Sequence, residues 1–537
     1  MNSGRRRWIA RAQAAAGVVA TAVLLAACGG GATGGSARTG GDESDLVQPA
    51  GAPAAPTSTL RVAVDQEIPN LDPPRSSPFA GPMIHAAYDT LTSIGPDGAA
   101  APWLATGWTQ PDPLTWQFAL RDDVTFHDGS AFDAETVKLN LERNKGITGS
   151  PWSYVYDPIT EVTVLDPRTV RISFSTPQPG FPESMGQIAG AMVSPKAITE
   201  GVDLTRAEAG SGGWRWAPNE HIEGSKHVFH ANPDYWNPDA VKVETIEVHV
   251  IEDAMARVNA VQSGQVDIGK PLSPDLYSAA EGAGLVVINK LPATGTLVIF
   301  DREGAMVPAF AEPEVRQAMA MLIDRQAYST AVLAGKGDPS NGFGAPGTWW
   351  RNEEIADAQP FDVEKAKELL AAAGYPDGFS FDAPTNPATK NQNEAIAQML
   401  AKGGITMNLV GTADGQYTAD IRKGRFAAGY LVPSATDPYT WWSRSISNNS
   451  PYNPFGLTDM ADLEAKYVEA TGAADQATRK RLLDEIQAEV IERGIVVTTG
   501  FTATGVVLAP SIRFTQVPVF SPNEHMPRPF YVWKADH

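Results

Sequence analysis

The chain has 537 residues, of which 43% are hydrophobic, and it carries 42 Lys+Arg against 62 Asp+Glu for a net charge of −20. This length exceeds the roughly 250–300 residues at which one core stops growing, so we expect several domains and exclude a globally disordered chain. The acidic balance argues against a nucleic-acid partner, and the single cysteine excludes an internal disulfide or a cysteine-based zinc site.

Residues 1–27 are predicted to be a lipoprotein signal peptide. Four arginines and no acids occupy residues 1–12, and an apolar stretch follows at 14–27, which is the order of charged and hydrophobic regions in an export signal. Fourteen apolar residues are too few for a bilayer core of about 30 Å, which needs roughly 20 helical residues, so we expect no permanent transmembrane segment. The general secretory and twin-arginine export routes both stay open.

The only cysteine, Cys28, follows this signal directly. The sequence LAACG at 25–29 resembles a bacterial lipobox, in which small residues admit the peptidase and the cysteine thiol receives a lipid. We therefore predict lipidation of Cys28 and anchoring at the extracytoplasmic face of the bacterial cytoplasmic membrane, at the cell surface or in the periplasm. The alternative is a buried free cysteine that happens to follow a signal peptide.

A flexible tether is predicted over residues 28–57, because the segment consists largely of Gly, Ala, Ser, Thr, Pro and Asp. The next segments mix two periodicities. Alternating hydrophobicity predicts strands at 60–64, 115–120, 169–174 and 241–250. Helical periodicity appears at 253–262, 313–333, 362–373, 391–402 and 474–493. The fold class is therefore α/β with mixed sheets, and the absence of a repeat of 20–50 residues excludes solenoids and propellers.

No common catalytic motif occurs in the chain. HExxH, GxSxG and the phosphate-binding loop are all absent. His221, His227 and His230 cluster in sequence, but His227 and His230 would face opposite sides of a strand, which favours solvated imidazoles over a metal site. We predict that the protein is not an enzyme and has no catalytic residues, no metal and no cofactor. A secreted lipoprotein hydrolase is the less favoured alternative.

One block, residues 120–138 (LRDDVTFHDGSAFDAETVK), resembles the signature of extracellular solute-binding proteins of family 5, the peptide, dipeptide and nickel-binding subunits of ABC importers. Further matching motifs follow in the family's order. They are NLDP at 70–73, YDTL at 88–91, APWLATGW at 101–108, GSGGW at 210–214, NPDYW at 232–236, GQVD at 264–267, VRQAM at 315–319 and IDR at 323–325. Two glycines, Gly213 and Gly494, stand where the family usually has proline.

The resemblance implies a two-lobe clamp like that of periplasmic binding proteins, of type II and of the large three-domain variety. The implied domains are a discontinuous domain I, an inserted domain II and a domain III that forms the second lobe. Domain I takes 58–92, 205–302 and 496–537, domain II takes 93–204, and domain III takes 303–495.

The implied function is capture of an extracytoplasmic solute between domains I and III and its delivery, in the closed form, to an ABC permease. A peptide is the favoured solute, and a nickel chelate, an oligosaccharide or another small solute is the alternative. The implied partners are the solute, the permease complex and the membrane through the lipid on Cys28, and we expect a monomer.

The candidate ligand-binding residues are Asp437, Trp441, Trp442, Trp349 and Trp350. Asp437 matches the family position whose carboxylate faces the α-ammonium group of a peptide, although an aspartate before proline also initiates turns. The paired tryptophans either line the cleft or pack in the core.

Overall fold

The computed structural model describes residues 46–67, 70–77, 80–95, 97–355, 358–413, 416–433, 437–473, 475–516 and 528–535, which fall in one compact unit. The predicted signal peptide, Cys28 and the first part of the predicted tether lie outside the described residues. Within this part of the chain, no helix combines the length and apolar composition needed to cross a membrane.

The largest sheet has eight strands in the order β15-β12-β16-β11-β1-β10-β9-β8. Its strands are β1 (Thr59–Val64), β8 (Trp214–Trp216), β9 (Lys226–Ala231), β10 (Thr245–Val250), β11 (Ile268–Leu272), β12 (Val286–Ile299), β15 (Ala428–Leu431) and β16 (Val496–Leu508). Strand β1 pairs in parallel with β10 and β11, and the other neighbours in this sheet are antiparallel. The prediction of an α/β fold with mixed sheets is confirmed.

A separate antiparallel sheet, in the order β4-β5-β7-β6, lies between β1 and β8 in the chain. Its strands are β4 (Ala105–Asp112), β5 (Thr115–Leu120), β6 (Ile159–Asp166) and β7 (Thr169–Phe174), and the same region holds α1 (Gly81–Ala87), β2 (Thr92–Ile94), β3 (Ala100–Pro102), α2 (Ala134–Lys145), α3 (Ser153–Tyr156), α4 (Phe181–Ser184) and α5 (Pro195–Glu200). Alternate residues of β5 are buried, as the sequence pattern predicts. Asp133 caps α2 by accepting the N–H of Thr136 at 2.8 Å.

Helices predominate between β12 and β16. They are α8 (Pro313–Met321), α9 (Arg325–Val332), α10 (Val363–Ala372), α11 (Lys390–Leu400), α12 (Tyr417–Arg422), α13 (Pro438–Trp441), α14 (Ala461–Gly472) and α15 (Gln476–Glu492), with the parallel pair β13 (Ser380–Thr385) and β14 (Thr406–Gly411). The prediction of a single helix over 313–333 is wrong. The segment is divided into α8 and α9 because the Asp324 side chain accepts the N–H of Ala327 and caps the start of α9.

The remaining regular elements are short. They are α6 (Ala254–Gln262), α7 (Tyr277–Gly282), the antiparallel pair β17 (Ile512–Phe514) and β18 (Val532–Lys534), a π-helical turn at Trp442–Ile446, and 3-10 turns at Pro49–Gly51, Pro73–Arg75, Ile188–Gly190, Pro238–Ala240, Pro274–Leu276, Pro308–Ala311 and Ala401–Gly403.

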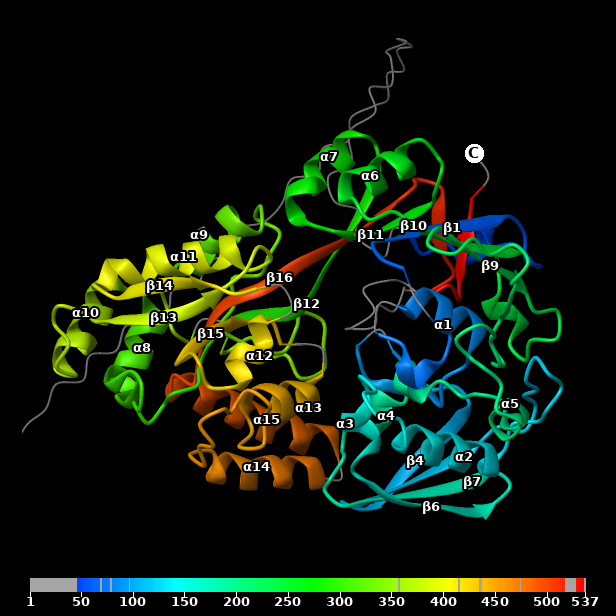
Figure 1. The fold of residues 1–537 in the computed structure, drawn as a ribbon, viewed down its shortest axis with the longest axis horizontal. Coiled ribbons are helices and arrows are strands. Elements are labelled where there is room, and N and C mark those ends of the chain that lie inside the picture. The colour runs from blue at the N-terminus through cyan, green and yellow to red at the C-terminus, as the bar shows by residue number, and fades with distance from the viewer. Residues whose placement is uncertain are drawn as a thin grey trace, which may run out of the picture. The chain divides into compact units, whose positions relative to one another are not determined.

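Strands β12 and β16 run side by side along their length and connect two groups of buried residues (Figure 1). One large hydrophobic cluster gathers many buried residues between 46 and 288 with residues of the last strands, and it includes Ile288 and Leu508. Two other clusters lie within 297–497 and include Leu297 and Val497. The two strands therefore form the continuous sheet connection between these cores.

The end of the predicted tether is packed against the body. Leu46 is buried in the large cluster, and the N–H of Gln48 donates to the carbonyl of Phe514 at 2.8 Å. From residue 46 onward the chain is therefore held by contacts with the pair β17–β18.

Glycine closes the longest helix for a steric reason. Gly494, just after α15, has φ +60°, and a Cβ there would lie 2.6 Å from Cβ of Arg316. Arg316 in turn donates from Nε to the carbonyl of Arg493 at 3.0 Å. The VRQAM motif thus contributes the side chain that binds the end of α15.

Candidate functional site

Four of the family-like motifs meet at one buried carboxylate, that of Asp89. It accepts hydrogen bonds from the indole of Trp103 (2.8 Å), the hydroxyl of Ser211 (2.9 Å), the hydroxyl of Tyr235 (2.7 Å) and the indole of Trp236 (3.1 Å). Burial raises the pKa of Asp89, and these four hydrogen bonds oppose that shift. Because Asp89 is only 1% exposed, this network holds the fold together and offers no surface to a ligand.

The signature block at 120–138 also has a structural role. The ring nitrogens of His127 lie 2.9 Å from the Glu208 carboxylate and 2.9 Å from the carbonyl oxygen of Gly212. Asp128 accepts the N–H of Ser130 and closes the turn before α2. The most recognisable motifs of the sequence therefore stabilise the scaffold, and the candidate site lies elsewhere.

Two adjoining pockets surround α13 and the π-helical turn after it. The larger pocket, of about 360 Å³, is lined by Tyr154 and residues 176–181 on one side and by Asp437, Trp442 and Glu464 on the other, among other residues. Its two sides come from the segment before β8 and from the helices before β16, which are far apart in sequence.

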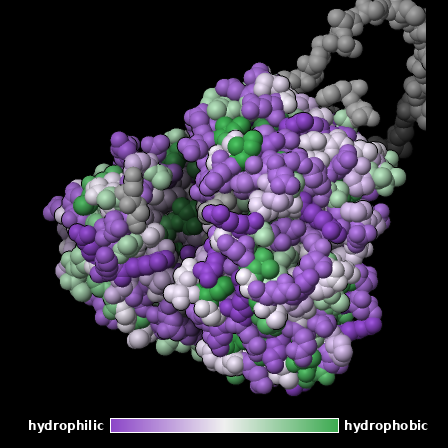
Figure 2. Space-filling view, turned by 45° about the vertical axis from the view of Figure 1, so that its right-hand side comes forward, coloured by the Kyte–Doolittle hydropathy of each residue, from purple (hydrophilic) through white to green (hydrophobic). Residues whose placement is uncertain are grey.

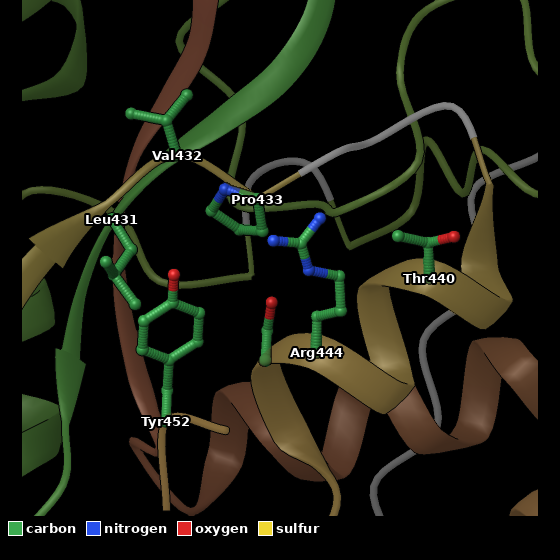
Figure 3. A pocket seen from close by; sticks show the side chains of 7 residues that line it. Leu431, Val432, Pro433, Thr440, Arg444 and Tyr452 are labelled. Atoms are coloured by element: carbon green, nitrogen blue, oxygen red, sulfur yellow. The ribbon is translucent and has the colours of Figure 1, made fainter. Parts of the chain in front are cut away.

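The smaller pocket, of about 130 Å³, lies at the end of β15. Its lining consists of Leu431, Val432, Pro433, Thr440, Arg444, Ser445 and Tyr452 (Figure 3). Thr440 lines both pockets. The two pockets therefore share a wall formed by α13.

Asp437 lines the larger pocket and caps α13. It is 9% exposed, and its carboxylate accepts the N–H groups of Tyr439 (3.0 Å) and Thr440 (2.9 Å). Burial raises the pKa of Asp437 against the effect of these bonds. A carboxylate has about four acceptor sites, so the capping role leaves capacity for a further donor.

The four candidate tryptophans divide into two groups. Trp442, 1% exposed, lines the larger pocket and stacks on Tyr467 with ring centres 4.8 Å apart. Trp350 and Trp441 are buried with their rings 5.6 Å apart, and Trp349 packs against the same core. These three lie outside the described lining of both pockets. Trp441 is the last residue of α13 and anchors this helix in the core that also holds Trp350.

Two charged residues that the sequence did not single out adjoin the pockets. Glu183 in α4 has its pKa raised to about 7, first by burial and then by the negative charge of Asp437. Arg444 lines the smaller pocket. Neither residue belongs to a motif, and no local sequence signal marks either of them. Glu183 is notable because of Asp437, which is more than 200 residues away in the chain, and Arg444 is notable because it lines a pocket.

The histidine cluster is only partly as predicted. His230 is exposed and contacts Glu220, whereas His227 is 5% exposed and bonds to Glu67 at 3.0 Å. His227 and His230 lie on opposite faces of β9, as expected. The prediction that His227 is solvated is wrong, because the face of β9 that carries it is buried. Within the described ranges, no three or more His, Cys, Asp or Glu residues are placed to hold a metal.

The sequence of this chain is similar to one known family and to named proteins of bacteria. A model of the family described as bacterial extracellular solute-binding proteins, family 5 Middle, matches residues 99–453. The glutathione-binding protein GsiB of Salmonella paratyphi A is 30% identical over 467 residues, which cover 82% of this chain and 88% of that protein. GsiB of Escherichia coli O157:H7 is 28% identical over 404 residues, covering 72% and 74%.

Solved structures have the same fold. The unliganded open form of MppA, a periplasmic murein tripeptide binding protein, has a TM-score of 0.77 at 19% identity and covers 91% of this chain and 99% of its own. DppA from Helicobacter pylori in complex with the peptide STSA has a TM-score of 0.70 at 21% identity, covering 90% and 99%. The fold is therefore that of periplasmic binding proteins.

Proposed function

The chain belongs to the bacterial extracellular solute-binding proteins of family 5, which serve ABC importers, and from this premise we propose that it captures a peptide outside the cytoplasm and presents it to an ABC permease. The observation that carries the proposal is the larger pocket with its two carboxylates, Asp437 and Glu464, and no cationic side chain in its described lining. A peptide brings an α-ammonium group that such a pocket would stabilise. The relatives named for glutathione or peptide binding support the same class of solute.

The proposed mechanism is closure of a clamp around the solute. In the proposed division, domain I (58–92, 205–302 and 496–537) and domain III (303–495) are joined by β12 and β16, and domain II is 93–204. The larger pocket is lined by residues of domain II (between 154 and 184) and of domain III (between 437 and 471). A solute bound there would contact both of these domains, and it would favour the closed state because its affinity for the closed form exceeds its affinity for the open form. Changing the ratio of closed to open protein from 1:99 to 99:1 takes a difference of about 5.5 kcal/mol between the binding free energies of the two states. The permease then recognises the closed form, and the protein binds its solute without catalysis.

We further propose that lipidated Cys28 holds the protein at the extracytoplasmic face of the cytoplasmic membrane. The lipobox-like sequence at 25–29 supports this anchor. The segment from residue 29 to residue 45 would then separate the lipid from the packed chain that begins at Leu46, and the protein would act as a monomer.

The test of the solute class combines two measurements. Mass spectrometry of the purified protein should detect bound intact peptides, and calorimetric titration should show tighter binding of a free tripeptide than of its N-acetylated form. The preference for the free amine should decrease in Asp437→Asn. Equal affinity for both forms would remove Asp437 from this role, whereas a bound nickel chelate, an oligosaccharide or released cleavage products would overturn the peptide proposal.

A further inference from the structure

Residues 46–58 connect the predicted tether to β1, and the first of them are bound by the pair β17–β18. The side chain of Leu46 is 7% exposed. Val47 forms a parallel bridge to Phe514, and the N–H of Gln48 donates to the carbonyl of the same residue at 2.8 Å. Side-chain burial and backbone bonding together therefore attach this segment to β17.

The same segment covers a tryptophan on β18. Val532 is fully buried in the large hydrophobic cluster, so the side chain of the next residue, Trp533, points to the opposite face of the strand. Trp533 is nevertheless only 6% exposed. The turn Pro49–Gly51 lies so close to its indole that a Cβ on Gly51 would be 2.7 Å from the ring. The turn therefore takes the place of water on this ring, and glycine permits the close approach.

A second set of hydrogen bonds holds the other end of the segment. The N–H of Thr57 donates to the carbonyl of Lys242 at 3.2 Å, and the N–H of Glu244 donates to the carbonyl of Ser58 at 3.0 Å. The residues that bind the two ends of the segment all belong to the proposed domain I. The connection from residue 46 to β1 is therefore fixed on one domain at two points.

The attachment at residue 46 shortens the chain that can extend from Cys28. Residues 29–45 number 17, and a chain of this length reaches at most about 60 Å when fully extended. Without the contacts to β17–β18, the extendable chain would run to residue 56. It would then have 28 residues and a reach of at most about 100 Å.

We propose that residues 46–51 form a clip that docks the tether on β17–β18 and thereby holds domain I near the membrane, with this edge toward the bilayer. The inference rests on the proposed lipid anchor and deepens it, because the clip sets where on the body the anchor pulls and how far the body moves from the lipid. A short leash keeps domain I within reach of a permease in the same membrane.

Hydrogen exchange of the purified protein tests the docking. Fragments that cover residues 46–52 should exchange about tenfold or more slowly in wild type than in Gly51→Leu, because the added side chain displaces the turn from Trp533 and opens its amides to water. Leu46→Ser removes the buried side chain and should have the same effect. Ala54→Leu changes an exposed residue of the same segment, so it is the matched control and should exchange as wild type does.

Energy transfer on liposomes tests the consequence for the lipidated protein. The lipid would occupy the only cysteine of the chain, so Asp239→Cys introduces a single free thiol for a dye. Asp239 is exposed in the turn Pro238–Ala240, which accepts a hydrogen bond from the segment that enters β18. Transfer to acceptor lipids should be lower with Gly51→Leu or Leu46→Ser than in wild type or Ala54→Leu, because the longer free chain lets domain I move away from the bilayer.

The outcomes separate the clip from the anchor. Equal exchange of residues 46–52 in wild type and both clip variants overturns the clip, and so does equal transfer for a variant that has lost its protection. Wild-type protein that does not bind liposomes overturns the lipid anchor, and the exchange measurement then still decides whether the segment is docked. Thermal unfolding checks each variant, and Leu46→Ser supplies the comparison if Gly51→Leu does not fold.

Discussion

Asp89 is the residue at which four of the family-like motifs meet. Its two oxygens receive four side-chain hydrogen bonds from segments up to 147 residues away, in a site that water does not reach. We expect Asp89→Asn to lower the free energy of unfolding by about 3 kcal/mol or more. The amide NH₂ group would face hydrogen-bond donors and leave them unpaired, and each buried unpaired donor costs about 1–3 kcal/mol. Urea denaturation followed by tryptophan fluorescence measures the loss.

Asp275→Asn is the control for this change. Asp275 is exposed within the 3-10 turn Pro274–Leu276, and surface substitutions usually change stability by less than about 0.5 kcal/mol. A loss below about 1 kcal/mol for Asp89→Asn would mean that the network is rearranged easily, and it would contradict the structural role.

Glu183 makes stability depend on pH. Burial and the charge of Asp437 raise its pKa from 4.5 to about 7, so the folded protein keeps a proton that the unfolded chain releases. Between pH 4.5 and about 7, the Glu183 carboxyl group binds more protons in the folded protein than in the unfolded chain. The free energy of unfolding therefore falls as pH rises through this range. Glu183→Gln imitates the protonated form, and we expect the variant to be more stable than wild type at pH 8 and nearly equal to it at pH 4.5.

Denaturation curves at several pH values, with Glu142→Gln on the exposed side of α2 as the control, measure this difference. The charged groups facing Glu183 are Asp437, which raises its pKa, and Arg479, which lowers it. Parallel stability profiles for wild type and Glu183→Gln would show that the carboxyl group titrates normally.

At the scale of elements, the pair β12–β16 carries an irregularity near its centre. Gly295 faces Gly500, but Thr296 faces Thr498, so β16 has one extra residue there. Gly500 has φ +102°, and a Cβ on it would lie 2.5 Å from the carbonyl oxygen of Asp338. The bulge is therefore possible only with glycine at this position.

We expect Gly500→Ala to lower the free energy of unfolding by about 1–3 kcal/mol, because it adds backbone strain and a steric clash. Gly282→Ala at the end of α7 is the opposite control, since it has open space and an ordinary φ, and it should stabilise by up to about 1 kcal/mol. Chemical denaturation compares the two. Equal effects from both changes would argue against strain at the bulge.

Elements with strong local signals were predictable. The alternation in β5 and β7 and the cap of α10, where Asp362 accepts the N–H of Lys365 at 2.9 Å, follow from adjacent residues. The division of 313–333 at Asp324 was missed because apolar periodicity continues across it, and the competing side-chain bond is visible only in the folded backbone.

At the scale of the whole molecule, the visible face in Figure 2 is largely hydrophilic, with separate hydrophobic spots. This agrees with the net charge of −20, which favours solubility. A hydrophilic face offers little apolar area to a bilayer, and the lipid proposed on Cys28 would supply the apolar group for membrane anchoring.

We expect Cys28→Ser to move the protein from the membrane fraction to the extracytoplasmic soluble fraction and to abolish incorporation of labelled fatty acid. Peptide affinity should not change, because the described pockets are formed by residues after 150. Fractionation with immunoblotting, beside the Asp275→Asn protein as a correctly processed control, measures the distribution. A Cys28→Ser protein that stays with the membrane would rule out lipidation as the anchor.

The sequence by itself determined the family and the class of fold, because motifs, strand alternation and helix caps depend on residues that are neighbours in the chain. It also singled out Asp437, which precedes a proline at the start of α13, as a candidate ligand-binding residue, and that role stays a prediction. Only the tertiary structure decided which residues meet. It placed Trp350 and Trp441 in a core, assembled the donors around Asp89, and brought Glu183 near Asp437 and Arg444 into a pocket. A pocket and its charges result from long-range packing, and no local pattern specifies which distant side chains share it.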